Sequence, residues 1–522
     1  MATPALQDAP QKVELRRDLT KVESYATIIG ILIGSGIFVV TGQTGAITGP
    51  SVPLAYIVLA PIILATAVAY SVYLSTPLGV RPGDAYLHIS RTTRSYYAGF
   101  IALWLKWLAY IGALVILSTS FAQYLKFFYP NMDQTLAAVL PFGEALARRY
   151  PAGPSMAEAV VATAAIVFFF IMNLLGVKVY GRLQTLMVIV LVLAIVVLVA
   201  PGVFAVHWRN FSPLFPYGIR VTSDGGVQKG FLAALPPLFF SYAGFESLAQ
   251  TAGETREARK SLPIIFINGV LISMVIFFLM SFVAFGVIPY QELALSKHAM
   301  SDVAARFLPW WGGAVVTVGA LMSFSTCMNA TLFVPARILY VFGEDRMLPQ
   351  WVAGVSRRFR TPWVSLVVNS SIAIVLLWTK SFKYVLEIAL VAMFLYYLLH
   401  SASLVLLPFV RPALYRKAGV RPHPALIVLS GLVSIASMGY LAGSLIVNDI
   451  SARQLLAPAE RGLAIWQLLI VWAGVGTLFY LGGRWEGRRN GFDYARQLTS
   501  DWLDHDRQQE GPTTREEATK QE

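Results

Sequence analysis

The sequence has little charge and almost no cysteine. Only 13% of its 522 residues are charged, about half the fraction that a soluble protein carries. In contrast, 56% are hydrophobic and the mean hydropathy is +0.62. The single cysteine, Cys327, excludes an intrachain disulfide. The first twenty residues hold no apolar core, so we expect no cleaved signal peptide. The composition excludes an ordinary soluble domain.

Long apolar runs fill most of the chain. They reach the length of about 20 residues that a membrane-spanning helix needs, and they recur from the first tenth of the sequence to its last tenth. We therefore predict an all-α polytopic membrane protein with about twelve spans. The expected spans are 26–46, 52–76, 96–128, 157–175, 183–206, 231–253, 264–288, 312–342, 364–379, 385–410, 425–447 and 463–481.

The net charge of +13 comes from cations between the spans. The basic segments that share one side of an even-span topology with the N-terminal segment are 81–94, 178–182, 256–260, 346–360, 411–421 and the tail after 484. Cytoplasmic loops collect lysine and arginine. We therefore expect a multi-pass protein of the cell membrane, with both termini cytoplasmic, lipid as its surroundings and no nucleic-acid partner.

Glycine interrupts two of the spans. Residues 34–36, Gly-Ser-Gly, lie inside the first span, and Gly244 lies inside the sixth, after Pro236-Pro237. Within a membrane, backbone that leaves the helix must be buried in protein or line a cavity. The first interruption alone could be a packing surface or a helix opened for binding. Interruptions at matching positions of two halves favour binding.

The motifs resemble those of the amino acid–polyamine–organocation (APC) superfamily of transporters. The matching stretches are 34–38 (GSGIF), 81–86 (RPGDAY), 240–247 (FSYAGFES), 253–255 (GET), 262–263 (LP), 336–340 (ARILY) and 345–349 (DRMLP). The resemblance implies a leucine-transporter-type fold of two inverted five-helix repeats, with broken helices 1 and 6. It divides the chain into a cytoplasmic segment 1–25, a transport core 26–410 (repeats 26–206 and 228–410), two peripheral helices in 411–483 and a cytoplasmic tail 484–522.

The resemblance also implies a substrate site at the two breaks. Amide groups of Ser35, Gly36 and Ile37 at a half-helix start would suit a carboxylate. Carbonyls near Phe240, Ser241 and Ala243 would accept from an ammonium group, and Phe240 takes the place of an occluding aromatic. The expected substrate-binding residues are Ile33, Gly34, Ser35, Gly36, Ile37, Phe240, Ser241, Ala243 and Gly244.

Ion coupling is the next expectation. Sodium-coupled relatives of this fold use carbonyls of span 1 and hydroxyls of span 8. The corresponding residues here are Gly30, Ile33, Met322, Ser325 and Thr326. Some proton-coupled members carry a lysine in span 5, where this chain has Leu191, which puts that lysine mechanism in doubt. Sodium coupling, proton coupling and exchange without an ion all stay open, and no other metal or cofactor is expected.

Two charged residues inside spans are further coupling candidates. Lys106, in span 3, could extend to the interface, stack on tryptophan, pair with a carboxylate or favour an anionic substrate. Glu246 follows the span-6 break and could brace it or carry a proton. A lone histidine such as His400 in span 10 is more often a hydrogen-bonded structural group than a relay.

These features predict a secondary active transporter of amino acids, neutral ones above all, that works by alternating access. The alternatives are a non-transporting amino acid sensor and a transporter of polyamines or other organic cations. No nucleophile–base motif or metal-ligand cluster supports an enzyme. The pattern does not indicate an oligomeric state.

Overall fold

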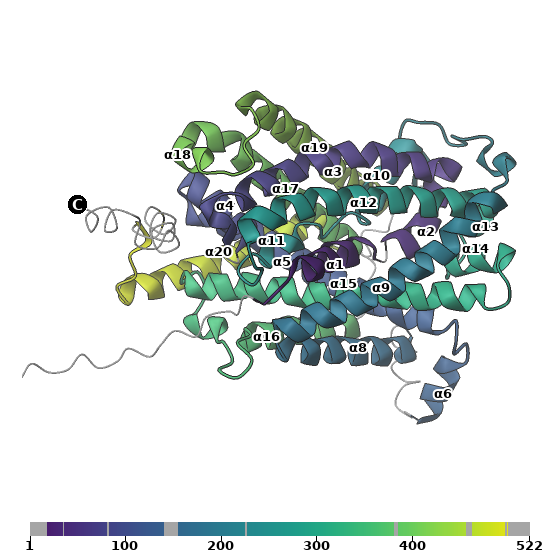
Figure 1. Cartoon of the computed structure of the whole chain (residues 1–522), viewed down its shortest axis with the longest axis horizontal. Helices are drawn as coiled ribbons and strands as arrows, with labels where there is room; N and C mark the ends of the chain where they lie inside the picture. The colour runs from purple at the N-terminus through teal and green to yellow at the C-terminus, as the bar shows by residue number, and fades with distance from the viewer. Residues whose placement is uncertain are drawn as a thin grey trace, which may run out of the picture.

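The structure is a computed structural model. It describes residues 18–34, 36–80, 83–139, 155–224, 227–379, 385–455, 462–495 and 498. Long helices lie side by side along one direction, and short helices and loops gather at the two ends of this bundle (Figure 1).

Apolar helices long enough to cross a membrane dominate the described residues. Nine helical runs meet that criterion, one of which covers residues 21–74 and contains three separate helices. The uninterrupted long helices are α3 (Val52–Leu74), α5 (Tyr96–Leu125), α8 (Met156–Leu174), α9 (Val177–Gly202), α12 (Ala258–Val287), α15 (Gly312–Glu344), α17 (Val385–Val410), α19 (Pro424–Gln454) and α20 (Ile465–Arg489). The apolar α16 (Trp363–Trp378) is shorter. The chain is therefore a mostly helical, multi-pass membrane protein.

The two predicted interruptions are real. The first span consists of α1 (Lys21–Leu32), a non-helical step, the short π-helix η1 (Gly36–Val40) and α2 (Thr41–Thr48). The sixth consists of α10 (Phe231–Phe239), turns over 240–246, and α11 (Ser247–Gln250). Gly244 has φ +101°, a conformation that residues with a side chain rarely adopt, so a glycine is required at this turn.

Shorter elements cap the two ends of the bundle. At the left end of Figure 1 lie α4 (Asp84–Thr93), α18 (Pro412–Arg416) and the end of α20. At the right end lie α6 (Met132–Val139), α13 (Tyr290–Leu293) and α14 (Ala299–Phe307). An antiparallel ribbon joins β1 (Thr222–Asp224) to β2 (Val227–Lys229), with Thr222 opposite Lys229. The short 3₁₀ turns are η2 (Gly49–Ser51), η3 (Pro77–Val80), η4 (Val203–Ala205), η5 (Trp208–Phe211) and η6 (Gln350–Ala353).

Several helices differ from the predicted spans at their ends. The helix α9 begins at Val177 and α12 at Ala258, six residues earlier than expected, so 178–182 is helical and the expected loop there is wrong. Lys178 and Arg182 remain exposed, because long cationic side chains carry their charge to water from inside a helix. For the same reason α20 continues to Arg489, beyond the expected start of the tail.

Two buried contacts fix the segments next to α1 and α11. Arg337 of α15 bonds Glu254 with both side chains buried, at an N–O distance of 3.0 Å. The backbone of Leu19 bonds Glu254 and Arg256 on either side of Thr255. The segment before α1 is thus tied to the segment after α11.

The helix α20 is attached to α5 by a tryptophan pair. The indole N–H of Trp104 donates to the carbonyl of Trp472 at 2.9 Å, and that of Trp472 donates to the carbonyl of Trp104 at 3.1 Å. The rings stack with centroids 4.8 Å apart. A Cβ at Gly476 would collide with the Trp104 ring, whereas a Cβ at Gly474 would meet nothing within 4 Å.

This contact predicts the effect of two matched substitutions on α20. Gly476→Leu places a side chain where the Trp104 ring lies and should cost about 1–3 kcal/mol of stability. Gly474→Leu should not lower the stability, because a Cβ there meets nothing within 4 Å. Thermal unfolding midpoints of the purified proteins in one detergent would compare them, and equal midpoints would contradict the Trp104 contact.

Candidate functional site

The two breaks lie directly against each other. A Cβ at Gly36 would overlap the backbone and hydroxyl of Ser241. A Cβ at Gly244 would lie 3.0 Å from the side chain of Ile31. Gly36 thus leaves room for the backbone of the span-6 break, and Gly244 leaves room for a side chain of the first span. The packing and binding interpretations of these glycines are compatible.

Hydroxyl groups join the breaks to α3. The Ser241 hydroxyl is 2.8 Å from that of Tyr56, which is 2.6 Å from that of Thr41. Thr41 also donates to the carbonyl of Gly36 at 3.1 Å. All of these side chains are buried, so the network fixes the two unwound segments relative to each other.

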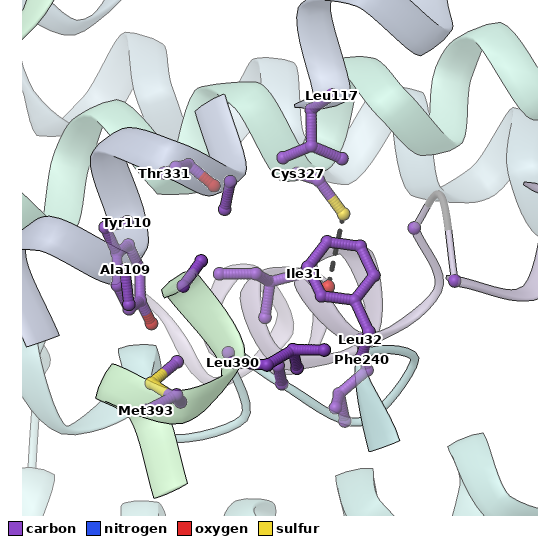
Figure 2. A pocket seen from close by; sticks show the side chains of 16 residues that line it. Ile31, Leu32, Ala109, Tyr110, Leu117, Phe240, Cys327, Thr331, Leu390 and Met393 are labelled. Carbon is purple, nitrogen blue, oxygen red and sulfur yellow. Dashed lines mark hydrogen bonds between the residues drawn. The ribbon is translucent and has the colours of Figure 1, made fainter. Parts of the chain in front are cut away.

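A cavity of about 50 Å³ lies beside the breaks (Figure 2). Helices α5, α15 and α17 form its other walls. The lining residues are Ile31, Leu32, Gly34, Gly36, Ala109, Tyr110, Ala113, Leu117, Phe240, Ala243, Gly244, Cys327, Thr331, Ala389, Leu390 and Met393. None of these side chains carries a charge, and nearly all are apolar.

The cavity is small in this conformation. A cavity that binds a benzene ring measures about 150 Å³, three times the volume observed here. The ring of Phe240 points into the cavity toward Ile31 and Cys327 (Figure 2). Because Phe240 leaves the helix at the span-6 break, movement of this turn would move the ring and enlarge the cavity.

The structure brings most of the predicted substrate residues together. Five of them line the cavity: Gly34, Gly36, Phe240, Ala243 and Gly244. The other described ones, Ile33, Ile37 and Ser241, are buried beside it. Ser35 lies outside the described residues. None of the described hydrogen bonds ends on the carbonyl oxygens of Ser241 and Ala243.

The walls from α5, α15 and α17 were not predicted. Their residues recur four positions apart, as in Ala109 and Ala113, or Cys327 and Thr331, so each pair shares one helix face. The sequence shows this spacing of small residues but not which face meets the breaks. The packing of the helices decides that.

The predicted sodium ligands are partly brought together. The Thr326 hydroxyl donates to the carbonyl of Gly30 at 2.8 Å. The carbonyl of Ile33 accepts from the hydroxyl of Ser323, not of Ser325. Both carbonyls therefore receive hydrogen bonds from α15.

Lys106 and Glu246 belong to a buried group of charges. Lys106 forms an ion pair with Asp84 of α4, and its Nζ lies 3.7 Å from Oε1 of Glu246. All three side chains are fully buried. Of the interpretations of Lys106, pairing with carboxylates is the one observed. We call Asp84, Lys106 and Glu246 the ionic cluster.

The cluster lies one side chain away from the cavity. Glu246 accepts hydrogen bonds from Tyr110 at 2.8 Å and from Tyr397. Tyr110 also lines the cavity. Glu246 therefore ties the span-6 turn to α5 and α17, which agrees with the bracing role considered for it.

The contact between α1 and α15 predicts a rescue experiment. A Cβ at Gly34 would lie 2.5 Å from Sγ of Cys327, so Gly34→Ala should lower both stability and ligand binding. Adding Cys327→Ala removes that sulfur and should restore much of the loss, with a coupling energy of about 0.5–3 kcal/mol. A double-mutant cycle of thermal unfolding midpoints measures it. If Gly34→Ala lowers the unfolding midpoint by the same amount with and without Cys327, the glycine is required by its backbone conformation and not by the close approach of the sulfur.

Comparison with known proteins agrees with this architecture. The model of the amino acid permease family matches residues 19–479. Three relatives come from Bacillus subtilis. The branched-chain amino acid permease BcaP is 26% identical over 432 residues, 82% of this chain and 89% of the relative. A methylthioribose transporter is 26% identical over 69% of this chain and 75% of its own. The serine/threonine exchanger SteT is 23% identical over 83% of this chain and 92% of its own. The chain belongs to the amino acid permease family of the APC superfamily.

Proposed function

We propose that this protein carries neutral amino acids across the cell membrane by alternating access. The observation that carries the proposal is the uncharged cavity beside two interlocked backbone breaks. Unwound segments at mid-span are where transporters of this architecture hold small substrates.

Backbone groups at the breaks recognise the two charges of an amino acid. The first amides of η1, at Gly36 and Ile37, have no partner within their helix. The helix continues through α2 to Thr48, so its dipole favours a carboxylate at this end. The carbonyls of Ser241 and Ala243 accept from the ammonium group on the opposite side.

The cavity walls determine which side chain the substrate amino acid can carry. Alanine, leucine and methionine side chains favour an apolar group, and no lining side chain could pair directly with a cationic one, so its burial would be costly. This argues against polyamines and other organic cations. Two relatives are named a branched-chain amino acid permease and a serine/threonine exchanger, and these names agree with a neutral substrate.

The fold supports an alternating-access cycle. We propose twelve spans, of which the first ten form two inverted five-helix repeats (26–206 and 228–410) and the last two, in 411–483, are peripheral. The end with α4 and α18 carries Arg91, Arg411 and Arg416, so this end and both termini face the cytoplasm.

The coupling ion, in this proposal, is a proton. Sodium at the predicted site would need free lone pairs on the carbonyls of Gly30 and Ile33, and on hydroxyls whose protons point away. Here Thr326 and Ser323 donate to these carbonyls. Sodium held by Thr326 and the Gly30 carbonyl would have to displace the hydrogen bond between them, whereas a proton requires no such change.

Transport itself is tested by counterflow. Proteoliposomes loaded with unlabelled leucine, valine or alanine should take up the same labelled amino acid faster than empty ones, because exchange needs no gradient of a coupling ion. Failure of counterflow across a panel of amino acids would contradict the proposal. Binding in a thermal-shift assay without counterflow would identify a sensor instead.

The proposed selection of substrate side chains is tested at Ala113, which lines the cavity. Ala113→Leu fills the cavity wall of α5 and should reduce uptake of leucine relative to alanine by at least about fivefold, since overfilling a packed site costs about 1–3 kcal/mol. The matched control is Ala200→Leu, on the exposed face of α9, which should leave the ratio unchanged. An unchanged ratio in Ala113→Leu would show that the substrate side chain lies elsewhere.

A further inference from the structure

We propose that the ionic cluster of Asp84, Lys106 and Glu246 binds the proton that is transported with each substrate. This inference rests on the proposed transport function and assigns its coupling site. The three residues come from three separate elements: α4, α5 and the turn of span 6.

The contacts within the cluster leave one acceptor unused. Oδ2 of Asp84 accepts from Lys106 and, at 3.0 Å, from Tyr396. Oδ1 of Asp84 is buried and has no hydrogen-bond partner among the described residues. Lys106 also donates to Tyr396 at 3.3 Å and lies over the rings of Tyr396 and Tyr110.

The charges of the cluster do not balance. Two carboxylates and one ammonium group leave one negative charge in a fully buried position. An unbalanced buried charge is costly, and such a group takes up or releases a proton instead. Burial raises the pKa of Asp84, although the Lys106 ammonium acts against this shift. The two carboxylates titrate as one unit, so the cluster rather than one residue is the site.

Among the residues that the structure describes, the other titratable groups around the cluster do not supply the missing positive charge. Tyrosine hydroxyls from three helices lie around it: Tyr70 of α3, Tyr110 of α5, and Tyr396 and Tyr397 of α17. His88 of α4 lies 3.0 Å from His400 of α17, nitrogen to nitrogen. Burial, with a smaller contribution from Lys106, lowers the pKa of His88 to about 3, so its imidazole is neutral.

The position of the cluster connects proton binding to movement. When both carboxylates are ionised, the Lys106 ammonium group attracts both of them and so ties the turn of span 6 to α4 through α5. A proton from water on the open side converts one carboxylate to a carboxylic acid and leaves a balanced pair. On Glu246 the proton releases the span-6 turn from Lys106, and on Asp84 it releases α4. Either position breaks the three-part connection, and loss of the proton to the opposite side restores it.

The first experiment uses the unaltered protein. Proteoliposomes are studied without sodium. The membrane potential is clamped at zero, and the lumen is one pH unit more alkaline than the medium. If one proton accompanies each substrate, an amino acid that supports counterflow should accumulate about tenfold at equilibrium, and a trapped dye should report acidification. Counterflow without accumulation or acidification would overturn the inference and leave the proposed function standing. Absence of counterflow would overturn both. In a parallel measurement without a pH gradient, accumulation driven by an inward sodium gradient would also overturn the inference.

The second experiment changes the charge count. Asp84→Asn leaves Lys106 and Glu246 as a balanced pair, so the accumulation ratio should fall from about tenfold toward one, and acidification should disappear. The ratio is an equilibrium quantity, so damage that only slows transport does not change it. Asp84→Glu should keep the ratio near tenfold.

The matched control is Glu254→Gln. Glu254 is also a fully buried carboxylate with a cationic partner, Arg337, but that pair is balanced. Glu254→Gln should slow transport or lower stability and keep the accumulation ratio. An Asp84→Asn protein that accumulates substrate as well as the unaltered protein would overturn the inference, as would loss of the ratio in Glu254→Gln.

Discussion

Contact between two unwound backbone segments is the constraint on which the rest of the structure depends. Gly36 admits the backbone of Ser241, and Gly244, at φ +101°, admits the side chain of Ile31. Larger residues at either glycine would separate the segments and disrupt the hydroxyl network around Tyr56. Unpaired backbone is tolerated at membrane depth only inside protein or beside a cavity. The contact therefore explains both why the breaks are stable and why the cavity lies beside them.

The sequence was informative where the controlling interactions are local. Hydropathy predicted the long helices, and glycine and proline predicted both breaks, because these signals act within one helix. Helix ends at Val177 and Ala258 were missed, since cationic side chains there extend to water from helical positions. The cavity walls and the pairing of Lys106 with Asp84 depend on how distant helices pack. Of the cluster, the sequence singled out Lys106 and Glu246 but not their partner, which belongs to the helix α4 in a region expected to be a loop.

The buried ion pairs differ in what they can do. Arg337 and Glu254 are balanced, and each is bonded to the other at 3.0–3.3 Å. Such a pair holds segments in place, and removing one partner leaves an uncompensated charge. The ionic cluster has one carboxylate more than it has cations, and a single added proton would balance its charge. The same chemistry thus gives a fixed contact at one position and a titratable one at the other.

In the proposed mechanism, Tyr110 is the side chain that connects the substrate to the proton. Its ring forms part of the cavity wall, while its hydroxyl donates to Glu246 at 2.8 Å. Substrate that presses on this ring changes the hydrogen bond to Glu246, and a protonated Glu246 changes the position of the ring. Thermodynamic linkage makes the two effects equal: a proton that alters substrate affinity by some factor has its own affinity altered by the same factor. A cavity without charge can therefore be coupled to a proton, because the charge lies one side chain behind its wall.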